Sequence, residues 1–161
     1  MMVIDVMNPE PVACMVDDPV SFVVKLLKKN NISGVPVLDG EKLAGVVSES
    51  DLLKLLSVKD ETGLLLPSPL EVLEIPIRDL IHWEKMQAGA EEIGKIPISE
   101  VMTKKIHTVS QDDSIETAAK LMVRHRINRL PVVLEDKLVG IVTRGDIIAG
   151  LGREEYEVEE D

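Results

Sequence analysis

Hydrophobic positions along the chain change their spacing in an order that occurs twice. Residues 20–27 and 115–122 carry apolar side chains three and four positions apart, which places them on one face of a helix. Two short runs rich in β-branched residues follow each helix, with a tight turn between them. These runs are 35–38 and 43–47 in the first copy, and 130–134 and 138–142 in the second. With an extended segment before (11–15 or 106–109) and a short helix after (51–56 or 146–151), the pattern predicts two β-α-β-β-α units.

A shift of 95 residues superimposes the two units without a gap, Ile4–Leu56 onto Ser99–Leu151, with 15 identities in 53 aligned pairs. The chain is therefore a tandem duplication. One unit of roughly 50 residues leaves the apolar face of its small sheet poorly covered, and two copies can bury those faces against each other. The predicted fold class is α+β, with duplicated units related by a pseudo-twofold axis and their sheets packed face to face.

Local signals predict where the first helix of each copy begins and ends. Asp18 and Asp113 are suited to cap the helix, with Pro19 at the first helical position in one copy and Glu116 completing a capping box in the other. The predicted helix ends are residues 30–31 and 125–126.

Four segments are expected along the chain. They are repeat 1 (1–57), a proline-rich insert (58–97) with a helix over 78–94, repeat 2 (98–151) and an acidic tail (152–161). The insert is too long for a plain linker in a compact domain, and it is interpreted either as a packing flap or as a lid or dimer arm. The tail is most simply a solvated, mobile end, with a partner contact as the alternative.

Composition excludes several classes of function. The chain has 161 residues, a formal net charge of −11 and 2% aromatic residues. This charge argues against nucleic acid or anionic lipid as the main partner, and three aromatics are too few for a base-stacking platform. The single cysteine, Cys14, excludes a disulfide framework and is interpreted as a core residue. Together with the lack of a long apolar run, it predicts a soluble cytoplasmic protein that does not cross a membrane.

The segment that leaves each hairpin carries the strongest candidate chemistry. A glycine is followed by two apolar residues, a hydroxyl and, three positions later, an aspartate: Gly45…Ser48…Asp51 and Gly140…Thr143…Asp146. The hydroxyl and the acid can simply cap the helix that follows. A carboxylate can also take both hydroxyls of a ribose, and helix amides can serve an adjoining phosphate. Because the arrangement occurs in both copies, binding is the favoured interpretation.

The order, spacing and duplication of these motifs resemble a tandem pair of CBS domains, the regulatory module named after cystathionine β-synthase. The resemblance rests on the pairs Val6-Met7 and Val101-Met102, on residues 32–37 and 127–132, and on the two hairpin exits. The long insert is similar to that of stand-alone archaeal members. The resemblance implies AMP, ADP, ATP or S-adenosylmethionine as a regulatory ligand, with no catalytic cofactor. It also implies a disc-like homodimer of four repeats and an effector protein that responds to the ligand.

By the family pattern, each ligand cleft combines residues of both copies. The first cleft is expected to contain Ser48, Asp51, Ile106, His107, Ile127, Asn128 and Arg129. The second is expected to contain Ile32, Ser33, Gly34, Thr143, Arg144 and Asp146. In these clefts the aspartates would hold ribose and the aliphatic residues would sandwich adenine. Glu49 in the first copy and Arg144 in the second occupy equivalent positions. Because the acid would repel a phosphate and the arginine would not, only one cleft is expected to bind tightly.

Other sites have weaker support. The three histidines, His82, His107 and His125, are far apart in sequence without paired carboxylates, which argues against a metal site. No nucleophile–base arrangement stands out, and the chain is not expected to be an enzyme. The rival hypothesis from another class is a structural scaffold that dimerises and docks on a partner while its clefts stay empty.

Overall fold

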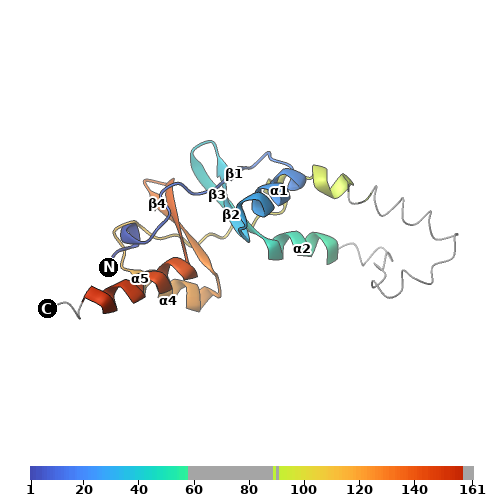
Figure 1. Cartoon of the computed structure of the whole chain (residues 1–161). Helices are drawn as coiled ribbons and strands as arrows, with labels where there is room; N and C mark the ends of the chain where they lie inside the picture. Colours follow the sequence, from blue (N-terminus) through green and yellow to red (C-terminus); the bar gives the residue numbers. More distant parts are fainter. Residues whose placement is uncertain (58–88, 90, 158–161) are drawn as a thin grey trace, which may run out of the picture. The chain divides into compact units, whose positions relative to one another are not determined.

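The computed structural model describes residues 1–57, 89 and 91–157, and it shows the same order of helices and hairpin strands in both repeats (Figure 1). The short strand that opens repeat 1 is matched in repeat 2 only by a single parallel bridge between Val109 and Val132. Repeat 1 contains η1 (Val3–Asp5), β1 (Cys14–Met15), α1 (Val20–Asn30), β2 (Gly34–Asp39), β3 (Lys42–Ser48) and α2 (Glu49–Ser57). Repeat 2 contains η5 (Ile98–Glu100), α4 (Ile115–His125), β4 (Arg129–Leu134), β5 (Lys137–Thr143) and α5 (Arg144–Glu157). The duplicated α+β architecture predicted from the sequence is confirmed.

The helix ends confirm one prediction and correct another. Asn31 and Arg126 both adopt the left-handed conformation that ends a helix, with φ of 52° and 53°. The N-caps, however, are Pro19 and Ser114, one residue after the predicted aspartates. Each aspartate instead closes the preceding turn, because its carboxylate accepts a backbone N–H three residues upstream, Met15 to Asp18 and Ser110 to Asp113, both at 2.8 Å. The hydrogen bond therefore points away from the helix.

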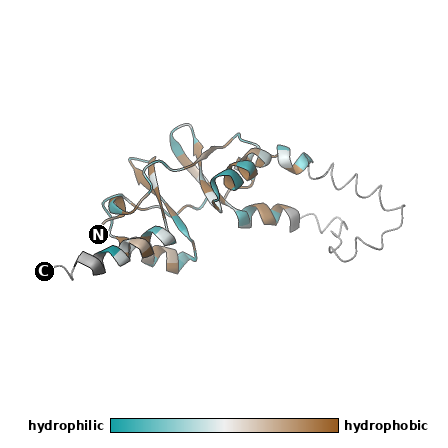
Figure 2. Ribbon diagram, in the orientation of Figure 1, coloured by the Kyte–Doolittle hydropathy of each residue, from teal (hydrophilic) through white to brown (hydrophobic). Residues whose placement is uncertain are grey.

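The strands carry mostly hydrophobic residues (brown in Figure 2), and they pair in the order β1-β2-β3-β5-β4. The antiparallel pairing of β3 with β5, at Lys42 opposite Lys137, joins the hairpins of the two repeats in one sheet. The tip of the first hairpin places Glu41 2.9 Å from Lys137, an exposed ion pair beside the junction.

The chain divides into two compact units that do not coincide with the repeats. One consists of Met1–Ala13, Leu38–Gly45 and Lys104–Asp161, and the other of Cys14–Val37 and Val46–Thr103. The opening segment of each repeat therefore belongs to the unit that holds most of the other repeat. In the first unit, Val3 is fully buried in one cluster with Leu130, Val132 and Val142.

Equivalent backbone bonds fix these opening segments. In the first unit, Asn8 and Ile141 exchange both N–H···O bonds, at 2.8 and 3.0 Å. In the second unit, Thr103 and Val46 do the same, at 2.8 and 3.0 Å, and Ile98 is fully buried. The two pairs are related by the 95-residue shift. Each hairpin strand is thus extended by a segment that comes from the other repeat.

The remaining predictions concern the insert, the tail and membrane insertion. Most of the predicted helix 78–94 lies outside the described residues. At its end, residues 91–95 are described, and they are helical. α5 continues to Glu157, so the first residues of the predicted acidic tail are helical. Among the helices in the described ranges, none has the length and apolar character needed to cross a bilayer.

Candidate functional site

The hydroxyl–aspartate motif of repeat 2 joins β5 to α5. Asp146 Oδ2 accepts hydrogen bonds from the backbone N–H and the Oγ1 hydroxyl of Thr143, both at 2.7 Å. The Asp146 amide in turn lies 3.3 Å from Thr143 Oγ1. This reciprocal pair caps the helix locally, as the simpler interpretation of the motif predicts. It also holds the Asp146 carboxylate in one orientation at the start of α5.

The motif of repeat 1 has the same local bonds and one more. Asp51 Oδ2 accepts from the N–H and the hydroxyl of Ser48, at 2.9 and 3.2 Å. The other oxygen, Oδ1, accepts from the hydroxyl of Thr103 at 2.9 Å. In repeat 2 the position of Thr103 is taken by Asn8, whose Oδ1 accepts from the amide of Glu10 at 3.0 Å. The bonds to Asp51 therefore use both carboxylate oxygens, whereas those described for Asp146 use Oδ2.

A backbone hydrogen bond places the loop after the first helix beside the motif of the same repeat. Glu49 N–H donates to the Ser33 carbonyl at 2.9 Å, and Arg144 N–H donates to the Asn128 carbonyl at 3.0 Å. Ile32 and Gly34 flank Ser33 in the first loop. By the family pattern, Ser33 and Asn128 are each expected in the cleft of the other motif. The composite clefts stay a prediction, but each loop is in contact with its own motif.

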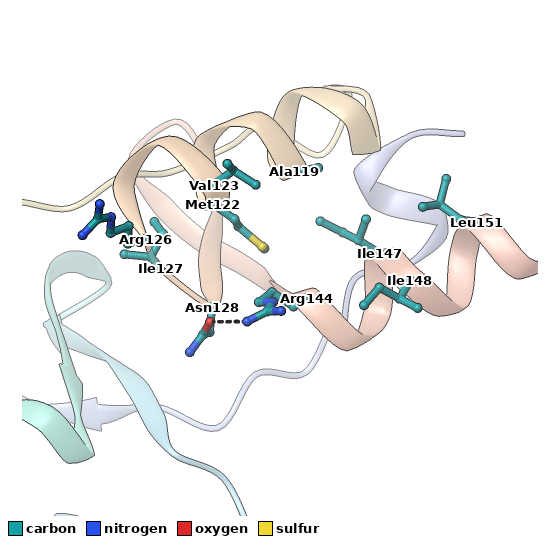
Figure 3. A pocket seen from close by; sticks show the side chains of 10 residues that line it. All are labelled: Ala119, Met122, Val123, Arg126, Ile127, Asn128, Arg144, Ile147, Ile148 and Leu151. Carbon is teal, nitrogen blue, oxygen red and sulfur yellow. Dashed lines mark hydrogen bonds between the residues drawn. The ribbon is translucent and has the colours of Figure 1, made fainter.

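A cavity of about 450 Å³ opens between α4 and α5, with a polar end and an apolar body (Figure 3). At the polar end, Arg144 Nη1 donates to Asn128 Oδ1 at 3.2 Å. Ile127 lies next to this pair, and Met122 and Ile147 line the body from the two helices. Such a volume is within the range of small-molecule sites, which combine apolar walls with a few polar groups. Three predicted residues, Ile127, Asn128 and Arg144, thus share one cavity.

Asp146 lines a second, smaller cavity of about 240 Å³ on the other side of the motif. Asp5, Val6 and Met7 contribute from the opening segment, and Arg153 from α5. A guanidinium and two carboxylates therefore surround this space. The start of α5 lies between the two cavities, with Arg144 lining one and Asp146 lining the other.

The remaining predicted residues lie around the same strands. Arg129 is the first residue of β4 and is opposite Thr143 in the β4–β5 register. Ile106 and His107 are half-buried in the segment before α4. His107 stacks on His125 with ring centroids 3.6 Å apart and an interplanar angle of 17°. The two rings are 18 positions apart in the sequence, and they meet because the end of α4 folds back beside residue 107. His82 lies outside the described residues.

Two described side chains, His125 and Cys14, have shifted pKa values. Partial burial lowers the pKa of His125, and the positive charges of His107, Arg124 and Lys105 lower it further. Burial raises the pKa of Cys14 to about 11, the nearby charge of Asp18 contributes, and the thiol lies 3.8 Å from the carbonyl of Pro36. Cys14 is buried, which confirms its interpretation as a core residue. Among the described residues, no group of three or more potential ligands could hold a metal ion.

Sequence reasoning missed Thr103 and His125 as site residues. Thr103 could have been found from its position one residue after Val101-Met102, since the 95-residue shift pairs it with Asn8. His125 was interpreted as a helix-end residue, and a single sequence carries no signal for its contact with a ring 18 positions away.

Two CBS domain matches, at residues 3–58 and 98–153, coincide with the two repeats. The chain therefore belongs to the CBS-domain family, as a tandem pair. An uncharacterized protein of Methanocaldococcus jannaschii is 40% identical over 154 residues, which is 94% of this chain and 91% of that protein. The chloroplastic CBS domain-containing protein CBSX1 of Arabidopsis thaliana is 35% identical over 78% of this chain and 52% of its own length.

Solved structures of CBS pairs have the same fold. CBSX2 in complex with AMP gives a TM-score of 0.69 at 25% identity, and the match covers 96% of this chain and 98% of that one. The CBS domain pair of protein MJ0100, from a complex with 5-methylthioadenosine and S-adenosyl-L-methionine, gives a TM-score of 0.69 at 24% identity over the same shares. Both neighbours are thus similar over nearly their whole length.

Proposed function

We propose that this CBS pair is a regulatory module that binds an adenosine-containing ligand, AMP, ADP, ATP or S-adenosylmethionine, and has no catalytic activity of its own. Binding would stabilise one arrangement of the module by differential affinity, and an effector protein would respond to that arrangement. The cytoplasmic location expected from the composition is part of the proposal. The AMP and S-adenosylmethionine complexes of the structural neighbours support the ligand class.

The observation that carries the proposal is the held carboxylate at the start of α5. Thr143 fixes Asp146 through two hydrogen bonds to Oδ2 at 2.7 Å, so a ligand would meet an oriented acceptor. A ribose diol could donate to Oδ1 of Asp146. The guanidinium of Arg144, two residues earlier in the chain, could pair with a phosphate. Ile127 supplies an apolar surface beside Arg144 for a base.

Repeat 2 is favoured as the tighter site. Thr103 already donates to Asp51 Oδ1 at 2.9 Å, so a ribose at repeat 1 would have to displace that bond. Glu49 stands there in place of Arg144 and would repel a phosphate. We therefore expect one strong site per chain, centred on Thr143, Arg144 and Asp146.

A thermal-shift screen with AMP, ADP, ATP, S-adenosylmethionine and NADH tests the proposal. A ligand at 100 times its Kd stabilises the folded state by about 2.7 kcal/mol, which moves Tm visibly for a chain of this length.

The variant Asp146→Asn separates ligand binding from folding, because Asn keeps an oxygen that can cap the helix. Substitution by Ala would remove a cap contribution of about 0.5–2 kcal/mol.

The matched variants Asp146→Asn and Asp51→Asn give opposite expectations. Loss of a charged acceptor costs about 1.5–3 kcal/mol of binding, or about 10- to 100-fold in Kd, and only Asp146→Asn should show it. Equal losses in both variants, or two equal sites per chain in calorimetry, would contradict the assignment to repeat 2. The absence of any shift with all five compounds would favour the rival scaffold, whose clefts stay empty.

We also propose that two chains associate through the outer face of the helices. On this face Val123 is 80% exposed, Ile148 64% and Leu151 49%. All three residues line the 450 Å³ cavity, and Leu151 lies at the end away from Asn128 and Arg144 (Figure 3). Leu53 of α2, the residue equivalent to Ile148, is also 64% exposed. An exposed apolar patch on repeat 2, with an exposed leucine at an equivalent position of repeat 1, is what a symmetric homodimer would bury.

A further inference from the structure

The histidine pair, His107 stacked on His125, belongs to a segment with an excess of positive charge. Residues 101–134 contain six lysines and arginines and three acidic residues, in a chain whose formal net charge is −11. The charges that act on His125 are cationic on both sides: Arg124 from its own helix, and Lys105 and His107 from the segment before α4. Arg126, the next residue along, lines the end of the cavity between α4 and α5 (Figure 3).

The duplicated framework does not require this concentration. In repeat 1 the positions equivalent to His107 and His125 are Val12 and Asn30, and the position of Lys105 is Glu10. Repeat 1 nevertheless forms the same helix and hairpin. Cations in the last turn of a helix are stabilising by themselves, as Lys28 and Lys29 of α1 illustrate. That effect accounts for Arg124, but not for the cations that residues 104–107 bring from a different segment.

Stacked imidazoles tolerate one proton more easily than two, because two protonated rings 3.6 Å apart repel each other. Lys105 and Arg124 add to that repulsion. An anion bound against the pair would remove it, since a nearby negative charge favours the protonated form of both rings. The stacked pair and its cationic neighbours are thus suited to bind an anion.

We propose that the histidine pair, together with Lys105 and Arg124, forms a binding site for a phosphate-class oxyanion, tightened by protonation of the imidazoles. The site needs neither Thr143 nor Asp146, and it goes beyond the proposed adenosine site, although His107 was expected in that site too. The anion is either a free inorganic ion or the phosphate chain of a nucleotide.

Sulfate is the first probe, because its charge stays constant between pH 5 and 8 while the histidines titrate. The ring protons of the three histidines of the full chain are followed by NMR from pH 5 to 8, in sodium sulfate and in sodium chloride of equal ionic strength. Sulfate should raise the pKa of His125 relative to chloride, because the bound anion offsets the neighbouring positive charges that lower it. Correspondingly, sulfate should bind about tenfold more tightly at pH 5.5 than at pH 7.5 if one proton is taken up.

Matched variants separate a site from general attraction. Arg124→Gln and Lys29→Gln remove one charge from equivalent positions of the two repeats. Only Arg124→Gln should weaken sulfate binding, by about tenfold. The double variant His107→Val with His125→Asn carries residues that repeat 1 already uses, so it should fold and lose the pH dependence.

The proposal is overturned if sulfate and chloride give the same histidine pKa values, or if Lys29→Gln weakens binding as much as Arg124→Gln. Tripolyphosphate and ATP then identify the source of the anion. Displacement of tripolyphosphate by ATP from the wild type, but not from Asp146→Asn, assigns the site to the phosphate chain of a nucleotide. Tripolyphosphate that binds but is never displaced by ATP assigns it to a free anion. Because the sulfate arm involves no adenosine, it stands or falls separately from the proposed function.

Discussion

Two glycines of α5, Gly150 and Gly152, allow a direct test of how the opening segment packs on repeat 2. A Cβ added at Gly150 would lie 2.7 Å from Val6 Cγ1 and 3.0 Å from Met1 Sδ. A Cβ added at Gly152 would have no heavy atom within 4 Å. Both residues lie within the same helix, so Gly→Ala gives both variants the same gain in helix propensity.

The expected magnitudes follow from these contacts. Gly→Ala inside a helix stabilises by about 1 kcal/mol. Forcing an extra methyl group into a packed contact costs about 1–3 kcal/mol, because Val6 has to move. Gly152→Ala should therefore be about 1 kcal/mol more stable than the wild type, and Gly150→Ala should be about 1–3 kcal/mol less stable than Gly152→Ala. For a chain of this length, each kcal/mol corresponds to a change in Tm of about 2–4 °C.

Urea denaturation followed by circular dichroism measures both free energies of unfolding, with the m-value checking that the unfolding reaction is the same. The double variant Gly150→Ala with Val6→Ala is the control, since the shorter side chain makes room for the new methyl group. In this background, the cost of Gly150→Ala should shrink. Equal stabilisation by the two glycine variants would refute the packing of residues 1–6 against α5.

Three further outcomes are expected. Cys14, whose buried thiol has a pKa raised to about 11, should resist a thiol reagent at pH 8 in the native protein and react fully in denaturant, as an absorbance assay can show. Ser114→Ala should lower the free energy of unfolding by about 1 kcal/mol, because Ser114 Oγ caps α4 through Thr117 N–H at 3.1 Å, and thermal melts would detect this. Val123→Glu should abolish the proposed dimer without loss of helix signal; a mass in light scattering that is unchanged from the wild type would exclude that face as the interface.

Local elements could be predicted from the sequence because their causes are local. Apolar spacing determines α1 and α4, and the hairpins follow from β-branched runs around short turns. In the second turn, Glu135 and Asp136 both have positive φ, as a two-residue hairpin with a type I′ turn requires. Neither residue is glycine, so the turn was identified from its length and not from its composition.

The exchange of opening segments could not be predicted, because it depends on contacts far apart in the chain. Nothing in the residues around Val3 distinguishes packing on its own hairpin from packing on that of the other repeat. The choice lies in the fit against Gly140, where a Cβ would lie 2.9 Å from the Asn8 carbonyl. Gly45 holds the equivalent position of repeat 1. The two glycines therefore indicate that another backbone segment packs closely on each hairpin, but they do not show which segment it is.

The duplication separates what the fold needs from what one repeat adds to it. Positions that keep the same residue, such as Asp51 and Asp146, accept the same local hydrogen bonds from the preceding hydroxyl and amide. These bonds are explained by helix capping and are not by themselves evidence of ligand binding. Positions that differ show where the repeats have diverged without changing the elements. Thr103 engages the second oxygen of Asp51, whereas its equivalent Asn8 bonds to its own turn.

The same comparison applies to charge. Arg144 stands at the position of Glu49, and His107 and His125 stand at those of Val12 and Asn30, so repeat 2 has one cation and two ionisable imidazoles where repeat 1 is acidic or neutral. These groups repel one another where they lie close together, and they add nothing to the hydrogen bonds that the motif has in both repeats. A negatively charged ligand at repeat 2 gives them a common physical reason, and it is the reason why both proposed sites are assigned to that repeat.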